Sequence, residues 1–152
     1  MPVLYREWIF QPFGGLKQTS YDPQGPIAGP HAQGYGSAPD GTLADTTAQA
    51  PFKGADGAVV SNAADTATFL RALLGGGLVD RQRLVALWGS GADSGCGRGA
   101  YIGSGAGSAY TTNVLVNGDG SRIAVLLLNG RTANGRGDPT AAAAGTGLYC
   151  AA

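Results

Sequence analysis

The residues from Ala109 to Asn129 constrain the fold more strongly than any other part of the chain. Two runs of β-forming residues, Ala109–Val116 and Ile123–Asn129, flank the turn sequence Asn117-Gly118-Asp119-Gly120, and this pattern predicts a β-hairpin. The run Ile123–Leu128 is apolar on both faces of a strand. Since such a strand must be covered on both sides, we expect a central strand between layers of helices.

Helices are predicted before and after this hairpin. The surest one runs from Ala63 to Leu74, where Ser61 or Asn62 can cap the start, Asp65 favours the first turn and Gly75 ends the helix. The other segments expected to be helical are Met1–Phe10, Asp80–Trp88 and Pro139–Tyr149. With the hairpin, these helices predict the last third of a three-layer α/β/α sandwich.

Two long stretches carry no periodic pattern. Residues 17–53 hold most of the prolines, and Gly89–Gly107 is rich in glycine. Loops of this length in compact domains are usually functional or wrap a neighbouring element.

Composition excludes several classes of protein. The chain has 152 residues, enough for one domain with a core, and its ten basic residues balance its ten acidic ones. This balance argues against a nucleic-acid partner. We expect no membrane span and no signal peptide within the chain, because it has no apolar run of the needed length and no basic segment before an apolar one.

Cysteine and histidine are scarce, with two cysteines and one histidine, His31. Zinc sites usually need three or four protein ligands, so we expect no metal, and we expect no cofactor. Cys96 and Cys150 either form a disulfide, given an oxidising compartment, or are two unconnected thiols.

Four segments, in order along the chain, carry a family resemblance: Ile9–Tyr21, the Pro-His-x-x-Gly-Tyr element at 30–35, Phe52–Leu74, and the strand pair beginning at Ala109. Together they resemble the serine β-lactamase-like family, the group of class C β-lactamases, D-alanyl-D-alanine carboxypeptidases and related esterases. The resemblance implies an α/β (α+β) fold of the β-lactamase/transpeptidase type, with an antiparallel sheet flanked by helices plus a helical region.

The resemblance also implies an organisation of the chain. In that family, the counterpart of Phe52–Leu74 lies well after the catalytic nucleophile, so the chain is expected to be the back half of such an enzyme and one incomplete domain. Residues 1–90 would be part of the helical, cleft-lining region, and residues 91–152 the C-terminal hairpin and helix of the sheet region. Family members are typically exported, which implies an extracellular or periplasmic location.

The family's first two catalytic motifs are absent from the chain. Ser-x-x-Lys would supply an activated nucleophile, but the residues three places before Lys17 and Lys53 are Gly14 and Ala50. No tyrosine or serine has an asparagine two places later, so the Tyr-x-Asn motif is missing too. We therefore assign no catalytic residue.

The third motif, a cation or imidazole followed by Thr or Ser and then Gly, is partly present. Counting back from Tyr110, the equivalent residues are Gly103, Ser104 and Gly105, which are the candidate substrate-binding residues. Gly103 lacks the side chain that binds a substrate carboxylate in the family. Alternatively, Gly99–Gly107 has slipped or lost residues relative to the family pattern.

Two further residues have a functional and a structural interpretation. His31 could be a general base, but the resemblance places it in a structural or cleft-lining loop. Ser61 could be a nucleophile, although helix capping explains it better.

Two functions remain open. The chain is serine hydrolase-like, related to β-lactamases and carboxypeptidases, and inactive alone because the nucleophile is supplied upstream. Alternatively, it is a non-catalytic binding module or remnant that keeps part of a cleft for a peptidoglycan-type peptide or small molecule. In both cases the strand Ile123–Leu128 would lack a sheet neighbour, so we expect self-association through an uncovered edge.

Overall fold

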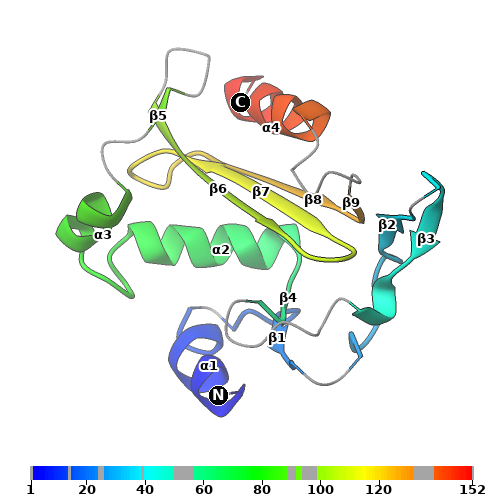
Figure 1. Ribbon diagram of the computed structural model, residues 1–152. Coiled ribbons are helices and arrows are strands. Elements are labelled where there is room, and N and C mark those ends of the chain that lie inside the picture. The colour runs from blue at the N-terminus through cyan, green and yellow to red at the C-terminus, as the bar shows by residue number, and fades with distance from the viewer. Residues whose placement is uncertain are drawn as a thin grey trace.

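The computed structural model describes residues 2–13, 15–23, 26–38, 40–49, 57–88, 92–93, 99–131 and 139–151. Its centre is an antiparallel sheet of four strands in the order β5-β6-β7-β8, with helix α2 on one face and helix α4 on the other (Figure 1). The bounds are β5 (Ala92–Asp93), β6 (Gly99–Ala106), β7 (Thr111–Val116), β8 (Ile123–Leu128), α2 (Ala63–Leu74) and α4 (Pro139–Ala151). The predicted hairpin and its two helical layers are confirmed.

The position of β8 in the sheet corrects one expectation. β8 pairs with β7 from Ile123↔Val116 to Leu128↔Thr111, and within the described residues it ends the four-stranded sheet rather than lying at its centre. Its two apolar faces are explained by helices, because α2 and α4 both pack on β8. Apolar residues on both faces of a strand predict two covering layers and say nothing about strand neighbours at its edges.

β6 forms where the sequence showed only a glycine-rich stretch. It pairs with β7 from Tyr101↔Val116 to Ala106↔Thr111. Three of its residues are glycine, a type that weakens isolated strands. The strand therefore owes its conformation to this pairing rather than to its own sequence.

Local signals set the starts of helix α2 and of the helix that follows it. The side chain of Asn62 accepts the N–H of Asp65 at 2.8 Å, so Asn62 rather than Ser61 caps α2. The next helix, α3 (Arg81–Trp88), follows Asp80, whose Oδ1 accepts the N–H of Arg83 at 3.0 Å.

The N-terminal segment is helical, as predicted, but changes type along its length. α1 (Pro2–Tyr5) continues as the π-helical turn η1 (Arg6–Phe10), which the N–H of Gln11 closes on the carbonyl of Arg6 at 2.9 Å. Phe10 packs in a core with three other buried side chains and with Phe69 of α2. The other buried members are Leu16, Tyr21 and Ala58.

A second core lies between the sheet and α4. Its buried members are Ala100 of β6, Leu115 of β7 and Tyr149 of α4. Helix α2 and the N-terminal segment thus share one core on one side of the sheet, and α4 has its own core on the other side.

Residues 17–49, expected to be irregular, form short strands through distant partners. β1 (Ser20–Tyr21) pairs with β4 (Val59–Val60). β2 (Tyr35–Ser37) pairs with β3 (Leu43–Asp45) and, in parallel, with β9 (Gly130–Arg131). A 3-10 turn, η2 (Thr47–Gln49), follows β3.

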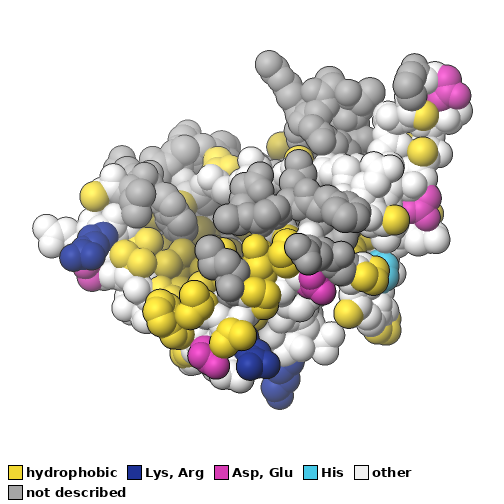
Figure 2. Space-filling model, turned by 60° about the horizontal axis from the view of Figure 1, so that its bottom comes forward, with side chains coloured by type: hydrophobic (Ala, Val, Ile, Leu, Met, Phe, Trp, Pro, Cys, Tyr) yellow, Lys and Arg dark blue, Asp and Glu magenta, His cyan; other side chains and the backbone are white. Residues whose placement is uncertain are grey.

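The outer surface of the N-terminal helix carries exposed apolar side chains. Figure 2 shows hydrophobic side chains gathered on this face of the molecule. Val3, Leu4 and Trp8 are 54 %, 43 % and 67 % exposed. None of the helices that the structure describes has both the length and the apolar character needed to cross a membrane.

Candidate functional site

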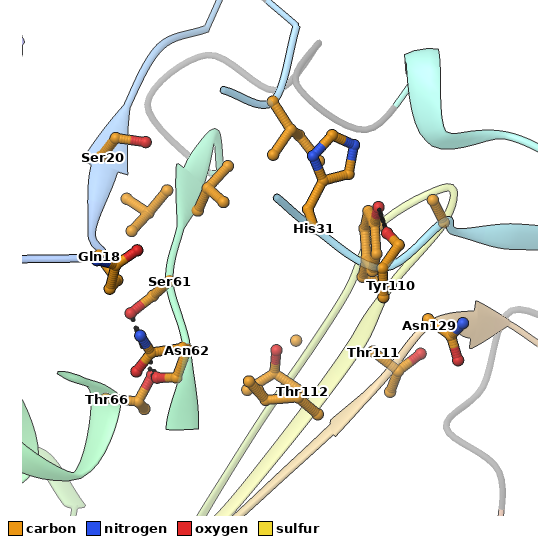
Figure 3. Close-up of a pocket in the computed structure, with 18 of the residues that line it drawn as sticks. Gln18, Ser20, His31, Ser61, Asn62, Thr66, Tyr110, Thr111, Thr112 and Asn129 are labelled. Atoms are coloured by element: carbon orange, nitrogen blue, oxygen red, sulfur yellow. Dashed lines mark hydrogen bonds between the residues drawn. The ribbon is translucent and has the colours of Figure 1, made fainter. Parts of the chain in front are cut away.

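A cleft of about 830 Å³ opens between the sheet, the β1–β4 ribbon and the loop around His31 (Figure 3). Its lining combines the start of α2, strands β1 and β4, and the ends of the three strands β6, β7 and β8. None of the described residues that line the cleft is Asp, Glu, Lys or Arg. Its polar groups are hydroxyls, amides, one imidazole and backbone.

One wall of the cleft is built on the start of α2. Ser61 lies 2.8 Å from the hydroxyl of Thr19, which itself donates to the carboxylate of Asp65 at 2.8 Å. The same carboxylate accepts the N–H of Gln18 at 2.8 Å. Asp65, expected only to favour the helix start electrostatically, therefore ties residues 18 and 19 to α2 and fixes the position of Ser61.

The opposite wall carries His31, Tyr110 and Asn129. Tyr110 donates its hydroxyl to the carbonyl of Ala32 at 2.6 Å, and Asn129 donates its amide to the carbonyl of Gln33 at 2.9 Å. These bonds hold residues 30–33 against the ends of β7 and β8. His31 lines the cleft, as the resemblance implied, and its Nδ1 lies 2.7 Å from the carbonyl oxygen of Gly29.

The third-motif residues lie on β6, beside this cleft. Gly107 donates its N–H to the carbonyl of Tyr110 at 2.9 Å, and hydrogen-bonded pairs alternate along an antiparallel ladder. The backbone N–H and C=O groups of Gly103 and Gly105 therefore bond to β7. Those of Ser104 and Ala106 point to the other edge of β6. No described strand pairs with that edge beyond Ala100.

The side chains of this motif are divided between the two faces of the sheet. Ala100 packs under α4, and side chains alternate along a strand, so Ser104 faces the α4 side, away from the cleft. Gly105, on the other face, lines the cleft. Substrate binding by Gly103, Ser104 and Gly105 stays a prediction.

Gly103 and Gly105 differ in the space around them. A Cβ atom at Gly103 would lie 2.8 Å from Cγ2 of Val114, whereas a Cβ atom at Gly105 would meet nothing within 4 Å. Gly103, the third-motif position that would carry a cation in the family, is therefore crowded, whereas Gly105, two residues later, has room for a side chain.

The sequence drew attention to His31, Ser61 and Gly105 in this site, and missed Thr19, Tyr110, Thr112 and Asn129. Each of the missed residues is an ordinary polar residue without a motif, and only the fold brings it to the cleft. Tyr110 has one local signal, because it is the residue from which the third motif was counted back, although no role in binding was predicted for it.

Among the described residues, neither a group that could hold a metal ion nor Cys150 lies at this cleft. The described residues contain no group of three or more His, Cys, Asp or Glu side chains that could hold a metal ion. Cys150 is disulfide-bonded and lies on α4, on the other side of the sheet. Cys96 lies outside the described residues, so its pairing with Cys150 stays a prediction.

Comparison with known proteins gives a family and a fold. The family model described as Beta-lactamase matches residues 1–146. A D-stereospecific amidohydrolase from a Streptomyces species has a similar structure, with a TM-score of 0.79 and 18 % sequence identity. The match covers 99 % of this chain and 48 % of that one, so the chain spans about half the length of the amidohydrolase structure. No curated protein sequence matches the chain.

Proposed function

The chain belongs to the β-lactamase family, and we propose that it is a serine hydrolase-like protein that binds an acyl ligand in its cleft and does not hydrolyse it alone. The proposed ligand class is a peptide or small molecule of the peptidoglycan type. The observation that carries the proposal is the cleft itself, which joins the start of α2 to the third-motif strand β6 and offers hydroxyls and amides for an acyl group.

The hydrogen bonds of Ser61 support the second part of the proposal, that the chain does not hydrolyse the ligand alone. A serine nucleophile needs a base that takes its proton. The hydrogen-bond partners of Ser61 in the described residues are Thr19, Thr66 and the carbonyl of Asn62, and none of these is a general base. Since the sequence also lacks Ser-x-x-Lys, we expect no acyl-serine on this chain.

Intact-protein mass spectrometry tests this expectation. The chain is incubated with a fluorescent penicillin and, separately, with an activated fluorophosphonate, after a cooperative unfolding transition has shown that it is folded. We expect the unmodified mass in both samples. A stoichiometric adduct on a serine would refute the proposal and show a nucleophile outside the family's first motif.

A second candidate function is amide or ester hydrolysis with the nucleophile supplied by residues outside those shown. The open edge of β6 favours it, because outward N–H groups such as those of Ser104 and Ala106 can stabilise an oxyanion. The same probes applied to the native source cells would then label a product that carries this chain, on a serine outside the 152 residues. Unlabelled product would count against this candidate.

A further inference from the structure

We propose that the cleft selects uncharged ligands that present an amide N–H, and discriminates against ligands that present a carboxylate. The inference rests on the proposed function and narrows its ligand class to internal or capped peptide amides. It follows from the charges of the lining, from the placement of its hydrogen-bond protons and from the space at Gly105.

The lining offers no positive side chain to a carboxylate. Of the described residues around the cleft, none is Lys or Arg, and the third-motif cation is replaced by Gly103. A carboxylate that leaves water without a cation partner loses much of its hydration energy. The closest carboxylate in the network, Asp65, lies behind Thr19 and adds negative charge to this wall.

On the α2 wall, three hydroxyl groups, those of Thr19, Ser61 and Thr66, donate their protons within the protein. Thr19 gives its proton to Asp65, so the 2.8 Å contact between Thr19 and Ser61 requires Ser61 to be the donor. Thr66 donates to the carbonyl of Asn62 at 2.8 Å. Ser61 and Thr66 therefore offer lone pairs to a ligand, and these accept hydrogen bonds from a ligand N–H.

On the opposite wall, too, several hydrogen-bond protons are donated within the protein. The hydroxyl proton of Tyr110 goes to Ala32, and one of the two amide protons of Asn129 goes to Gln33. Because a carbonyl only accepts, the contact with Gly29 makes Nδ1 of His31 the donor, so in the neutral tautomer that makes this bond Nε2 is an acceptor.

The acceptors described above, together with the absence of a cation among the described lining residues, match an amide better than a carboxylate. An amide donates N–H to the lone pairs of Ser61 or Tyr110, while its carbonyl can accept from Thr112, whose hydroxyl rotates to suit. A carboxylate has acceptors only, so it would face these lone pairs with its own. Figure 3 shows the two walls facing one another across the cleft, with Thr112 between them.

Gly105 provides a clean way to change the charge of the cleft. It lines the cleft, a Cβ atom there would meet nothing within 4 Å, and its φ is not in the left-handed region. Gly105→Lys introduces a cation at the open position, and Gly105→Gln is the matched uncharged control.

The experiment is an NMR titration of the folded chain at pH 7 with N-acetyl-D-alaninamide and with N-acetyl-D-alanine, which differ only in the terminal group. In the natural chain and in Gly105→Gln, we expect the amide to bind about tenfold more tightly than the acid, the scale of one hydrogen bond left unmade. In Gly105→Lys, the ratio should fall or reverse. Resonances of Ser61, Tyr110 and Thr112 should shift.

The outcomes separate this inference from the proposed function. If the acid binds the natural chain as tightly as the amide or more tightly, the cleft is a ligand site and the selectivity inference is wrong. If neither compound shifts the resonances of the cleft, the proposed function and the inference both fail. Should Gly105→Lys not fold, the natural chain and Gly105→Gln decide the question by themselves.

Discussion

Gly34 lies where the loop that follows His31 crosses the end of the sheet, and it leaves no room for a side chain. A Cβ atom there would overlap Cβ of Ala109 and lie 2.9 Å from Cζ of Tyr110. We predict that Gly34→Ala lowers the free energy of unfolding by about 1–3 kcal/mol, because the β2 segment or the Tyr110 wall must move. Urea denaturation measures the change. Gly105→Ala, at an open position, is the control, and equal midpoints for the two variants would contradict the prediction.

The residue scale is also where the sequence says least about the site. Thr19, Tyr110 and Asn129 receive their roles from partners 46, 78 and 96 positions away in the chain. No local pattern encodes such contacts, since a threonine or an asparagine in a polar loop looks the same whether or not it faces a cleft. Gly105 could be found from the sequence because the third motif specifies residue types at fixed spacing.

At the scale of the element, α2 depends on a cap at its first turn. Asn62 accepts the N–H of Asp65 at 2.8 Å, which satisfies one of the helix's unpaired donors. We predict that Asn62→Ala lowers the free energy of unfolding by about 1 kcal/mol, whereas Asn62→Asp, which keeps the acceptor, changes it little. Thermal or urea denaturation of the three proteins checks this. Equal losses in both variants would mean that the cap contributes nothing.

The turn between β7 and β8 gives a prediction with a pH dependence. Asp119 accepts the N–H of Ser121 at 2.9 Å, and hydrogen bonds from the backbone and the side chain of Ser121 lower the pKa of Asp119 below the usual aspartate value of 3.8. A carboxyl whose pKa is lower in the folded state stabilises the fold above its unfolded pKa and loses that contribution as the pH falls through the folded pKa. The natural chain should therefore be more stable than Asp119→Asn at pH 7, and the difference should vanish in acid below pH 3.8. Urea denaturation across this range measures it, and a difference independent of pH would contradict the prediction.

A helix or strand could be predicted from the sequence where the interactions that form it lie within the element itself. The bounds of α2, Ala63–Leu74, were predicted because a cap, an apolar face and a glycine lie within the segment itself. β6 was not predicted, because its glycines carry no alternation and its conformation comes from β7. The short strands β1 and β2 were missed for the same reason, since Ser20 pairs with Val60 and Tyr35 with Gly130.

At the scale of the whole molecule, the open edge of β8 is the feature with the clearest consequence. The backbone N–H of Asn117 donates to the carbonyl of Arg122 at 3.1 Å, and hydrogen-bonded pairs alternate along the ladder. Ala124, Leu126 and Leu128 therefore bond to β7, whereas Ile123, Val125 and Leu127 turn their N–H and C=O groups outward. Within the described residues no strand pairs with these three, although Tyr35 donates to the carbonyl of Asn129 just beyond them.

We propose that a second copy of the chain pairs with this edge. The six residues of β8 are apolar and uncharged, and such an edge readily accepts another strand. An antiparallel pair centred on Val125 would place Ile123 opposite Leu127 and bring no like charges together. The expected result is a dimer in sedimentation velocity experiments that dissociates on dilution. A monodisperse monomer with a cooperative melting transition would overturn the proposal.

Val125→Pro tests whether β8 is the interface. Proline removes the outward N–H of Val125 and leaves the bonds to β7 intact, a substitution that edge strands tolerate. We therefore expect Val125→Pro to be monomeric at concentrations where the natural chain is dimeric, with a similar unfolding midpoint at low concentration. Leu126→Pro is the control one residue later: it removes an N–H that bonds to β7 and leaves its acceptor unpaired, so it should lower the free energy of unfolding by about 1–3 kcal/mol, in monomer and dimer alike. A Val125→Pro variant that still dimerises as the natural chain does would place the interface elsewhere on the molecule.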